Sequence, residues 1–509
     1  MNTYMTDNNN FQNMQVIDVE NTPEMRYFRL RMATHLGAAS LIYAAFATFC
    51  LYKNLSGVTM PFFGIATLIY MIYGLRQYDV KLKRTSWFIG YVIMALAVCN
   101  FMTGNSTILF FNNVGIIFMI FLFMLHNVYD DSCWNFTKTL SAIFEAFVWS
   151  IAALADFALD MRILKQRSME GYGKNIKKNY IKYILLGLLI AVPLVSILIL
   201  LLSQADRVFG ELLFKYLSFD IDIGSGIVIT LTFCTAFFAG YCMIRCFSKK
   251  TIKEEYDVKR DLEPLVAITV LSIVSVIYLL FSVIQIVYLF MGQGNPPEGY
   301  TYAQYAREGF FQLLVVSLIN FVMVIFINNR FRENRVLKVL LTIISLCTYI
   351  MIASSALRIK MYIDVYYLTE LRIWVIWGLT VLILLFAAVI VSIYKQDFPL
   401  FRYSIVVVSV LYIIIGYARP DYMIARYNLD QMNSVETSGL VSDYEYLKTL
   451  STDAAPVIAE TDFLFTDDTF EEEVKEAYFR RCRYFYENRS LRQFNISAYM
   501  AESSAEEYK

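Results

Sequence analysis

The run YILLGLLIAVPLVSILILLL, residues 183–202, decides the class of this protein because it carries no charge along its whole length. The hydrocarbon core of a bilayer is about 30 Å thick, and a helix needs about 20 apolar residues to cross it. Comparable apolar runs continue from His35 to Tyr417, and short charged loops separate them. The sequence therefore predicts an all-α protein, a polytopic transmembrane helical bundle.

Eleven membrane spans are predicted from these runs, with a twelfth left open. They cover residues 35–52, 58–75, 86–103, 107–126, 181–203, 223–245, 264–291, 309–328, 338–356, 371–394 and 401–417. The composition agrees, since 58% of the residues are hydrophobic and only 17% are charged, against about 25% charged in soluble domains. The predicted partner of this surface is the lipid bilayer. The formal net charge is zero, and no basic patch suggests nucleic-acid binding.

The segment 137–162 is the candidate for the twelfth span. At 100° per residue, Lys138, Glu145, Asp156 and Asp160 fall on one side of a helix. The opposite side carries Leu140, Phe147, Ile151, Leu154 and Ala158. Such an amphipathic helix tends to lie in the membrane surface, and we predict an in-plane helix here. The alternative is a span whose carboxylates face the interior of the bundle.

Basic clusters predict the orientation through the positive-inside rule. With 137–162 in the plane, all of them fall on the cytoplasmic side of the cell membrane. The predicted parts are a cytoplasmic N-terminal tail (1–33), a four-helix membrane segment (34–127) and a cytoplasmic segment (128–180), followed by a seven-helix membrane core (181–417) and an acidic, partly helical, extracytoplasmic C-terminal tail (418–509). The first 33 residues lack the apolar run of a cleavable signal peptide, so the first span is expected to act as the insertion signal.

This orientation gathers polar and aromatic connections on the outer face. The candidate cluster there consists of charged and polar residues near predicted helix ends: Asp206, Arg207, Arg307, Glu308, Arg358, Asp364, Thr369, Glu370, Arg372, Asp421, Arg426 and Asn428. One interpretation is a set of interfacial ion pairs and anchors. The other is an outward pocket for an anionic group, since the arginine side chain suits carboxylates and phosphates.

Several stretches of the chain resemble a bacterial multi-pass membrane family, domain of unknown function 4173, and its relative 4153. The stretches are LLSQADRVF (201–209), YAREGFFQLL (305–314), YYLTELR (366–372), ARYNL (425–429) and DYEYLKTLSTDAAPVI (443–458). The resemblance implies a common fold and a membrane location, and it implies no activity. Tyr367 departs from the pattern, because the family usually has glycine there, and this puts a tight turn in doubt.

Recognisable catalytic chemistry is scarce. With only His35 and His126 present, histidine triads and multi-histidine metal sites are nearly excluded, and no phosphate-binding loop or nucleophile elbow occurs. No catalytic residue, cofactor or metal ligand is predicted. The polar residues Asn100, Gln285, Gln312 and Asn320 within spans are expected to hydrogen-bond between helices.

Three functions are compatible with these features. The favoured one is a non-enzymatic binding or regulatory protein that faces the cell envelope and binds an envelope protein or an anionic envelope component. The alternative is a permease or flippase for an anionic or lipid-linked substrate, with Arg307, Arg358 and Arg372 at its entry. A membrane-embedded transferase with Asp206, Asp364 or Glu370 as base is less favoured.

Overall fold

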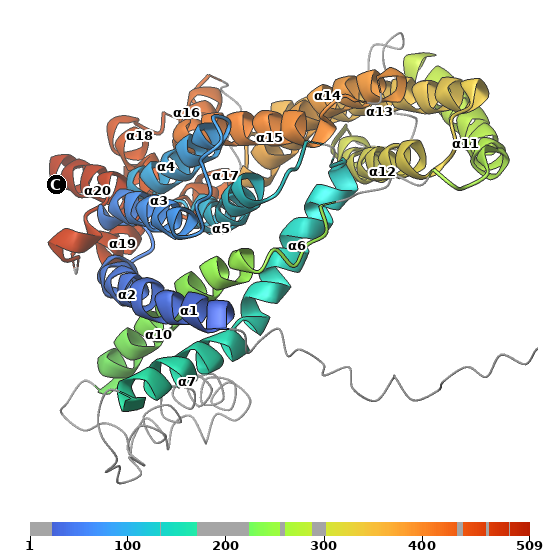
Figure 1. The fold of residues 1–509 in the computed structure, drawn as a ribbon. Coiled ribbons are helices and arrows are strands. Elements are labelled where there is room, and N and C mark those ends of the chain that lie inside the picture. The colour runs from blue at the N-terminus through green and yellow to red at the C-terminus, as the bar shows by residue number, and fades with distance from the viewer. Residues whose placement is uncertain are drawn as a thin grey trace, which may run out of the picture. The chain divides into compact units, whose positions relative to one another are not determined.

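The computed structural model describes residues 23–132, 134–170, 223–254, 260–287, 302–395, 397–434, 441–464, 468–487 and 489–508. Apart from an isolated bridge between Leu262 and Phe331, its regular structure is helical throughout these ranges (Figure 1). The all-α prediction is confirmed for them. The chain divides into two compact units. Unit 1 comprises residues 1–49 and 148–249, and unit 2 comprises residues 50–147 and 250–509.

Helices occupy every predicted span that lies in the described ranges. They are α2 (Gly37–Leu51), α3 (Thr59–Gln77), α4 (Ser86–Met102), α5 (Ser106–Val128), α10 (Ile223–Ser248), α11 (Pro264–Gln285), α12 (Tyr302–Arg330), α13 (Arg335–Tyr366), α14 (Glu370–Tyr394) and α15 (Leu400–Tyr417). The predicted span 181–203 lies outside the described residues.

Eight helices in the described part of the chain are long and apolar enough to cross a membrane. The short α4, with 17 residues, and α3 are not among them, so the count of eleven is not confirmed. A multi-pass membrane protein follows from the eight helices. Their apolar side chains are exposed as lipid contact requires: on α11, Leu265, Val276 and Leu280 are each more than 60% exposed.

Unit 1 is organised around a buried carboxylate. It contains α1 (Pro23–Arg31), the π-helical turn η2 (Met32–Leu36), most of α2, α7 (Leu154–Glu170) and α10. Asp160 of α7 is fully buried and accepts hydrogen bonds from Arg245 Nε (2.9 Å) and the Tyr241 hydroxyl (2.8 Å). Arg29 lies 3.6 Å from its other oxygen, and Lys249 pairs with Asp156 at 2.7 Å. Because a buried charge is costly without partners, this network ties α1, α7 and α10 together.

These contacts bear on the predicted in-plane helix 137–162. The segment forms α6 (Phe136–Ala152) and α7, which meet at a bend of 42° and would count as a ninth span if they cross together. Its predicted apolar side is exposed, as at Leu140 and Ile151, whereas Asp156 and Asp160 are buried. The alternative is a span whose carboxylates face the interior of the bundle, and it requires both carboxylates to be buried. Whether the segment spans or lies flat stays a prediction.

The membrane helices of unit 2 pack through apolar side chains with a few polar pairs between them. Leu271, Val324, Ile344 and Phe386 lie in the core formed by α11 to α15, and α15 also packs against α4. The expected interhelical bonds are confirmed for three of the four residues. Asn320 donates to Thr348 (3.0 Å), Asn112 donates to Asn100 (2.8 Å), and Gln285 accepts from Ser354 (2.6 Å).

The residues after α15 form a compact set of short helices, which we call the cap. It consists of α16 (Pro420–Met432), α17 (Val441–Leu447), η4 (Thr452–Ala454), α18 (Ala455–Glu460), α19 (Asp468–Tyr486), η5 (Leu491–Gln493) and α20 (Ile496–Tyr508). Its core includes Ile424, Tyr444, Ile458 and Tyr478, all fully buried, together with Ile373 from the first turn of α14. The cap helix α20 lies beside α4 (Figure 1). The tail was predicted to be partly helical, and its described residues form helices that enclose an apolar core, which was not predicted.

Candidate functional site

The cap is joined to the loop between α4 and α5 by two buried carboxylates. Asp453 accepts hydrogen bonds from the Thr103 hydroxyl (2.5 Å) and the Gly104 N–H (3.2 Å). Asp421 accepts from the Asn105 amide (3.0 Å) and from the backbone N–H of Ser451 (2.9 Å). A buried carboxylate with several donors is stabilised where an unpaired one would be costly. These bonds hold the cap against the loop.

Asp453 is the more deeply buried of the two, with 1% of its surface exposed. Burial raises its pKa, and this effect outweighs the hydrogen bonds from Ser497, Thr103 and Gly104 and the charge of Arg419, all of which lower it. The charged form of Asp453 is therefore less stable in the folded protein than it would be in water.

Glycines stand where the cap comes closest to two loops. A Cβ on Gly104 would lie 2.0 Å from the Thr452 hydroxyl oxygen, and one on Gly57 would lie 2.5 Å from the Arg492 carbonyl oxygen. Next to them, the Asn495 amide donates to the carbonyls of Ser56, Asn100 and Thr103. A larger residue at Gly57 would require the backbone at Arg492 to move, and one at Gly104 would displace the Thr452 hydroxyl, which bonds Ser497 within the cap.

A third contact joins the cap to the turn between α13 and α14. Asn428 accepts from the Leu368 N–H (2.8 Å) and donates to the Leu368 carbonyl (2.9 Å). Its side-chain amide thus forms the same pair of hydrogen bonds that the backbone of a neighbouring strand would form. The Glu370 N–H donates to the Tyr446 hydroxyl (3.2 Å). Tyr367, in the turn itself, has φ 59° and ψ −170°, a conformation essentially restricted to glycine. The tight turn is thus present, with a tyrosine in a conformation that favours glycine.

The described residues of the predicted outer-face cluster differ in their surroundings. Arg372 is buried, donates to the carbonyls of Tyr366 and Tyr367, and lies over the Tyr362 ring at 4.3 Å. Arg358 is buried beside Gly309 with its Nη2 3.5 Å from the Gln285 side-chain oxygen.

The other predicted positions differ in their surroundings. Asp421 and Asn428 are buried in the cap contacts, Asp364 is exposed, Thr369 and Glu370 are half-buried, and Arg426 is exposed and pairs with Asp430 at 3.2 Å. Asp206 and Arg207 lie outside the described residues, as do the side chains of Arg307 and Glu308. The cluster as a whole stays a prediction.

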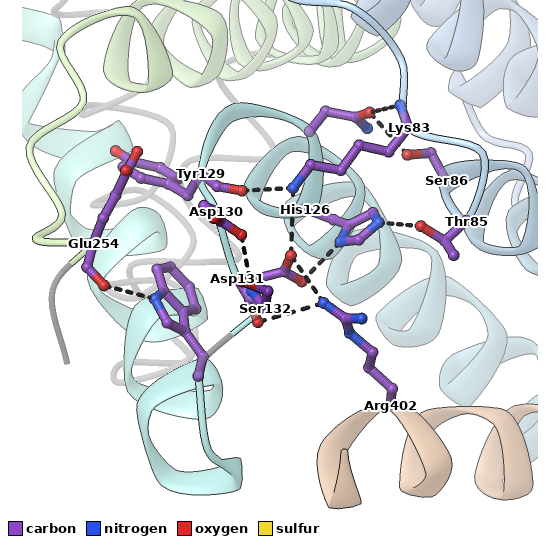
Figure 2. A network of polar contacts seen from close by, with 12 residues as sticks. Lys83, Thr85, Ser86, His126, Tyr129, Asp130, Asp131, Ser132, Glu254 and Arg402 are labelled. Atoms are coloured by element: carbon purple, nitrogen blue, oxygen red, sulfur yellow. Dashed lines mark hydrogen bonds and ion pairs between the residues drawn. The ribbon is translucent and has the colours of Figure 1, made fainter. Parts of the chain in front are cut away.

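At the opposite end of α4 and α5 lies a second polar network (Figure 2). The Thr85 hydroxyl bonds His126 Nε2, and His126 Nδ1 lies 2.7 Å from a carboxylate oxygen of Asp131. The other Asp131 oxygen is approached by Lys83 (3.4 Å) and Arg402 (3.2 Å). Figure 2 shows the side chains of Lys83, His126 and Arg402 converging on Asp131 from three directions. The network joins the loops after α3 and α5 to the start of α15.

Charge and burial compete at Asp131. Burial acts to raise its pKa, but the bond and charge of His126 and the charges of Arg402 and Lys83 outweigh it, and the pKa lies below the usual carboxyl value. Asp131 is therefore a carboxylate at neutral pH. His126 is 7% exposed and Thr85 is exposed, so the network leads from the interior to the surface.

A family model described as domain of unknown function (DUF4153) matches residues 90–461, which is more than half of the chain. The chain belongs to this family. Of the two related families that the sequence resembles, 4153 is the one that the match shows. No curated protein and no solved structure matches the chain.

The DUF4153 region includes the 103–105 loop and both buried carboxylates of the cap. Sequence reasoning selected Asp421 and missed Asp453, although Asp453 lies in the quoted stretch DYEYLKTLSTDAAPVI. It also missed the Thr85–His126–Asp131 network, because a count of two histidines argues against histidine triads and multi-histidine metal sites. One histidine is enough when a hydroxyl and a carboxylate lie on its two sides. The separations of 41 and 5 residues match no motif that a sequence pattern would identify.

Proposed function

We propose that this protein is an envelope-facing binding or regulatory protein of the cytoplasmic membrane and that the cap is its binding module. The observation that carries the proposal is the way the cap is built. It has an apolar core of its own, and buried polar contacts attach it to the 103–105 loop and to the turn at Tyr367. A module attached in this way presents a surface of defined shape, as a binding protein requires.

The charge of the cap favours one of the two partner classes. Residues 418–509 contain 18 acidic and 10 basic side chains, a difference of 8. Glu472, Glu473 and Glu502 are exposed on it. Complementary charge steers association and like charge opposes it, so this surface supports an envelope protein with a basic patch over an anionic envelope component.

The surroundings of two arginines also weigh against the permease alternative. Arg372 is committed to backbone carbonyls and a tyrosine ring, and Arg358 is buried between Gly309 and Gln285. An entry for an anion would need cations that face open water. Both side chains support anchoring.

The test is crosslinking in cells with a photoreactive residue at Tyr484, which is 79% exposed. We expect a discrete adduct that weakens at high salt. The double variant Glu472→Lys/Glu473→Lys should reduce it roughly tenfold, which corresponds to about 1.4 kcal/mol. The matched control is Glu263→Lys/Asp397→Lys, which reverses two exposed charges outside the cap and should leave the adduct unchanged. An adduct that is equally strong in both variants would refute the proposed role of the cap.

A further inference from the structure

The hydroxyl of Thr85, the imidazole of His126 and the carboxylate of Asp131 form a chain with the connectivity of a nucleophile, a base and an orienting acid (Figure 2). We call these three residues the relay. Thr85 lies at the N-terminal boundary of α4, yet its side chain caps no N–H of that helix. Its hydroxyl bonds His126 instead, in the arrangement that activates weak nucleophiles.

The hydrogen bonds on the two ring nitrogens of His126 suit this role. In the tautomer whose ring proton is on Nδ1, that N–H donates to the Asp131 carboxylate and Nε2 presents its lone pair to the Thr85 hydroxyl. Lys83 also donates to the Tyr129 carbonyl (2.8 Å), and Arg402 to the Asp131 carbonyl (3.4 Å). These bonds hold the loop that carries Asp131. The Asp131 carboxylate in turn fixes the orientation of the His126 imidazole.

Residues that adjoin Lys83 and Thr85 in the chain line an apolar cavity. It measures about 120 Å³, somewhat less than an apolar cavity of about 150 Å³ that accommodates benzene. Its walls include Leu68, Ile72, Leu82, Ser86, Trp87 and Phe123. Leu82 and Ser86 flank the Lys83–Thr85 segment in the chain, and Trp87 is 57% exposed. The cavity has the size and character to hold several carbons of a hydrocarbon chain whose remainder lies in the lipid.

We propose that Thr85 is the nucleophile of an acyl hydrolase whose substrates are esters or thioesters of apolar acyl chains. Thr85 Oγ attacks the acyl carbonyl and forms a C–O bond, while His126 Nε2 takes the hydroxyl proton. The bond from carbon to the leaving oxygen or sulfur breaks, and Nε2–H protonates that atom. Water then attacks the acyl-threonine with His126 again as base, and the acid leaves as Thr85 regains its proton.

The test uses the full-length protein in lipid nanodiscs with two probes that carry the same acyl chain, a phospholipid ester and a low-molecular-weight thioester. Mass analysis of proteolytic peptides measures acylation of Thr85, and release of the free acid measures turnover. Acylation with one probe identifies the donor class. We expect both readouts in the wild type and in Thr85→Ser, which keeps the hydroxyl, and neither in Thr85→Val.

Two further variants separate chemistry from folding. His126→Gln should slow acylation by roughly 10²- to 10⁴-fold, the usual contribution of a general base. Thr380→Val, which removes an exposed hydroxyl on α14 that donates to the Ile376 carbonyl (2.8 Å), should leave Thr85 acylation unchanged. Thermal unfolding of each variant checks that it is folded. If folded wild type and folded Thr85→Ser show no acylation with either probe, the relay is a structural link between loops and the proposal is wrong.

Discussion

At the scale of single residues, the aspartates at the two ends of α4 and α5 have pKa values shifted in opposite directions. Asp131 is surrounded by cations and its pKa lies below the usual value, whereas burial dominates at Asp453 and raises its pKa. Both are aspartates in loops or short helices, and nothing in their neighbouring sequence separates them. Asp160 is a third case, buried between two arginines. The surroundings set the character of each carboxylate.

Asp453 predicts a pH dependence of cap attachment. Because its pKa in the folded protein lies above the unfolded value of about 3.9, the folded state binds the proton more tightly. Its contribution to stability is present at low pH and declines as the pH rises through the folded pKa. We therefore expect wild type to lose stability relative to Asp453→Asn as the pH rises from about 4 toward 7. Hydrogen exchange of the cap measures this, with Asp430→Asn, at an exposed position, as control. Parallel curves for wild type and Asp453→Asn would contradict the assignment.

At the scale of elements, the turn between α13 and α14 shows a local preference overridden by tertiary contacts. Tyr367 takes a positive φ that costs a non-glycine residue about 1–3 kcal/mol. The two-way bond of Asn428 to Leu368 and the packing of Tyr367 and Leu368 against the cap core hold the turn. The cap therefore stabilises the very turn on which it rests.

The cost of the positive φ can be isolated by comparing two substitutions. Tyr367→Gly and Tyr367→Ala both lose the packing of the ring, but only glycine accepts the backbone conformation without strain. We expect the glycine variant to be more stable than the alanine variant by about 1–2 kcal/mol. Thermal unfolding of the purified variants in one detergent provides the comparison. Equal midpoints would mean that the turn relaxes to another conformation.

At the scale of the whole molecule, the contacts of the cap constrain its side of the membrane. The 103–105 loop and the turn at Tyr367 are both bonded to the cap, so they lie on the same side as it. Lys395 follows the far end of α14, a helix of 25 residues that is about 37 Å long. If α14 spans the membrane, the cap and Lys395 face opposite compartments. This conclusion does not depend on whether the cap or Lys395 is the one that faces the cytoplasm.

Thiol labelling of intact cells tests the predicted orientation. The native Cys482 is a poor reporter, because it is fully buried and burial raises its pKa to about 11. Two separate variants, Glu472→Cys and Lys395→Cys, serve as reporters instead, and both positions are exposed. Each variant also carries the substitution Cys133→Ser. We expect a membrane-impermeant reagent to label Glu472→Cys before lysis and Lys395→Cys only after it. The reverse pattern would place the cap in the cytoplasm.

The sequence by itself determined that this is an all-α, multi-pass membrane protein and where its long helices run. Uninterrupted apolar composition is a local property, and a bilayer requires it of any segment that crosses. Partial helicity of the tail was also predicted, whereas its apolar core was not. Only the tertiary structure decided that Asp453 and Asp421 meet the 103–105 loop, that Asp156 and Asp160 lie buried among cations, and that His126 joins Thr85 to Asp131. These contacts link residues up to 350 positions apart, and their energies depend on burial and on neighbouring charges, which exist only once the helices have packed.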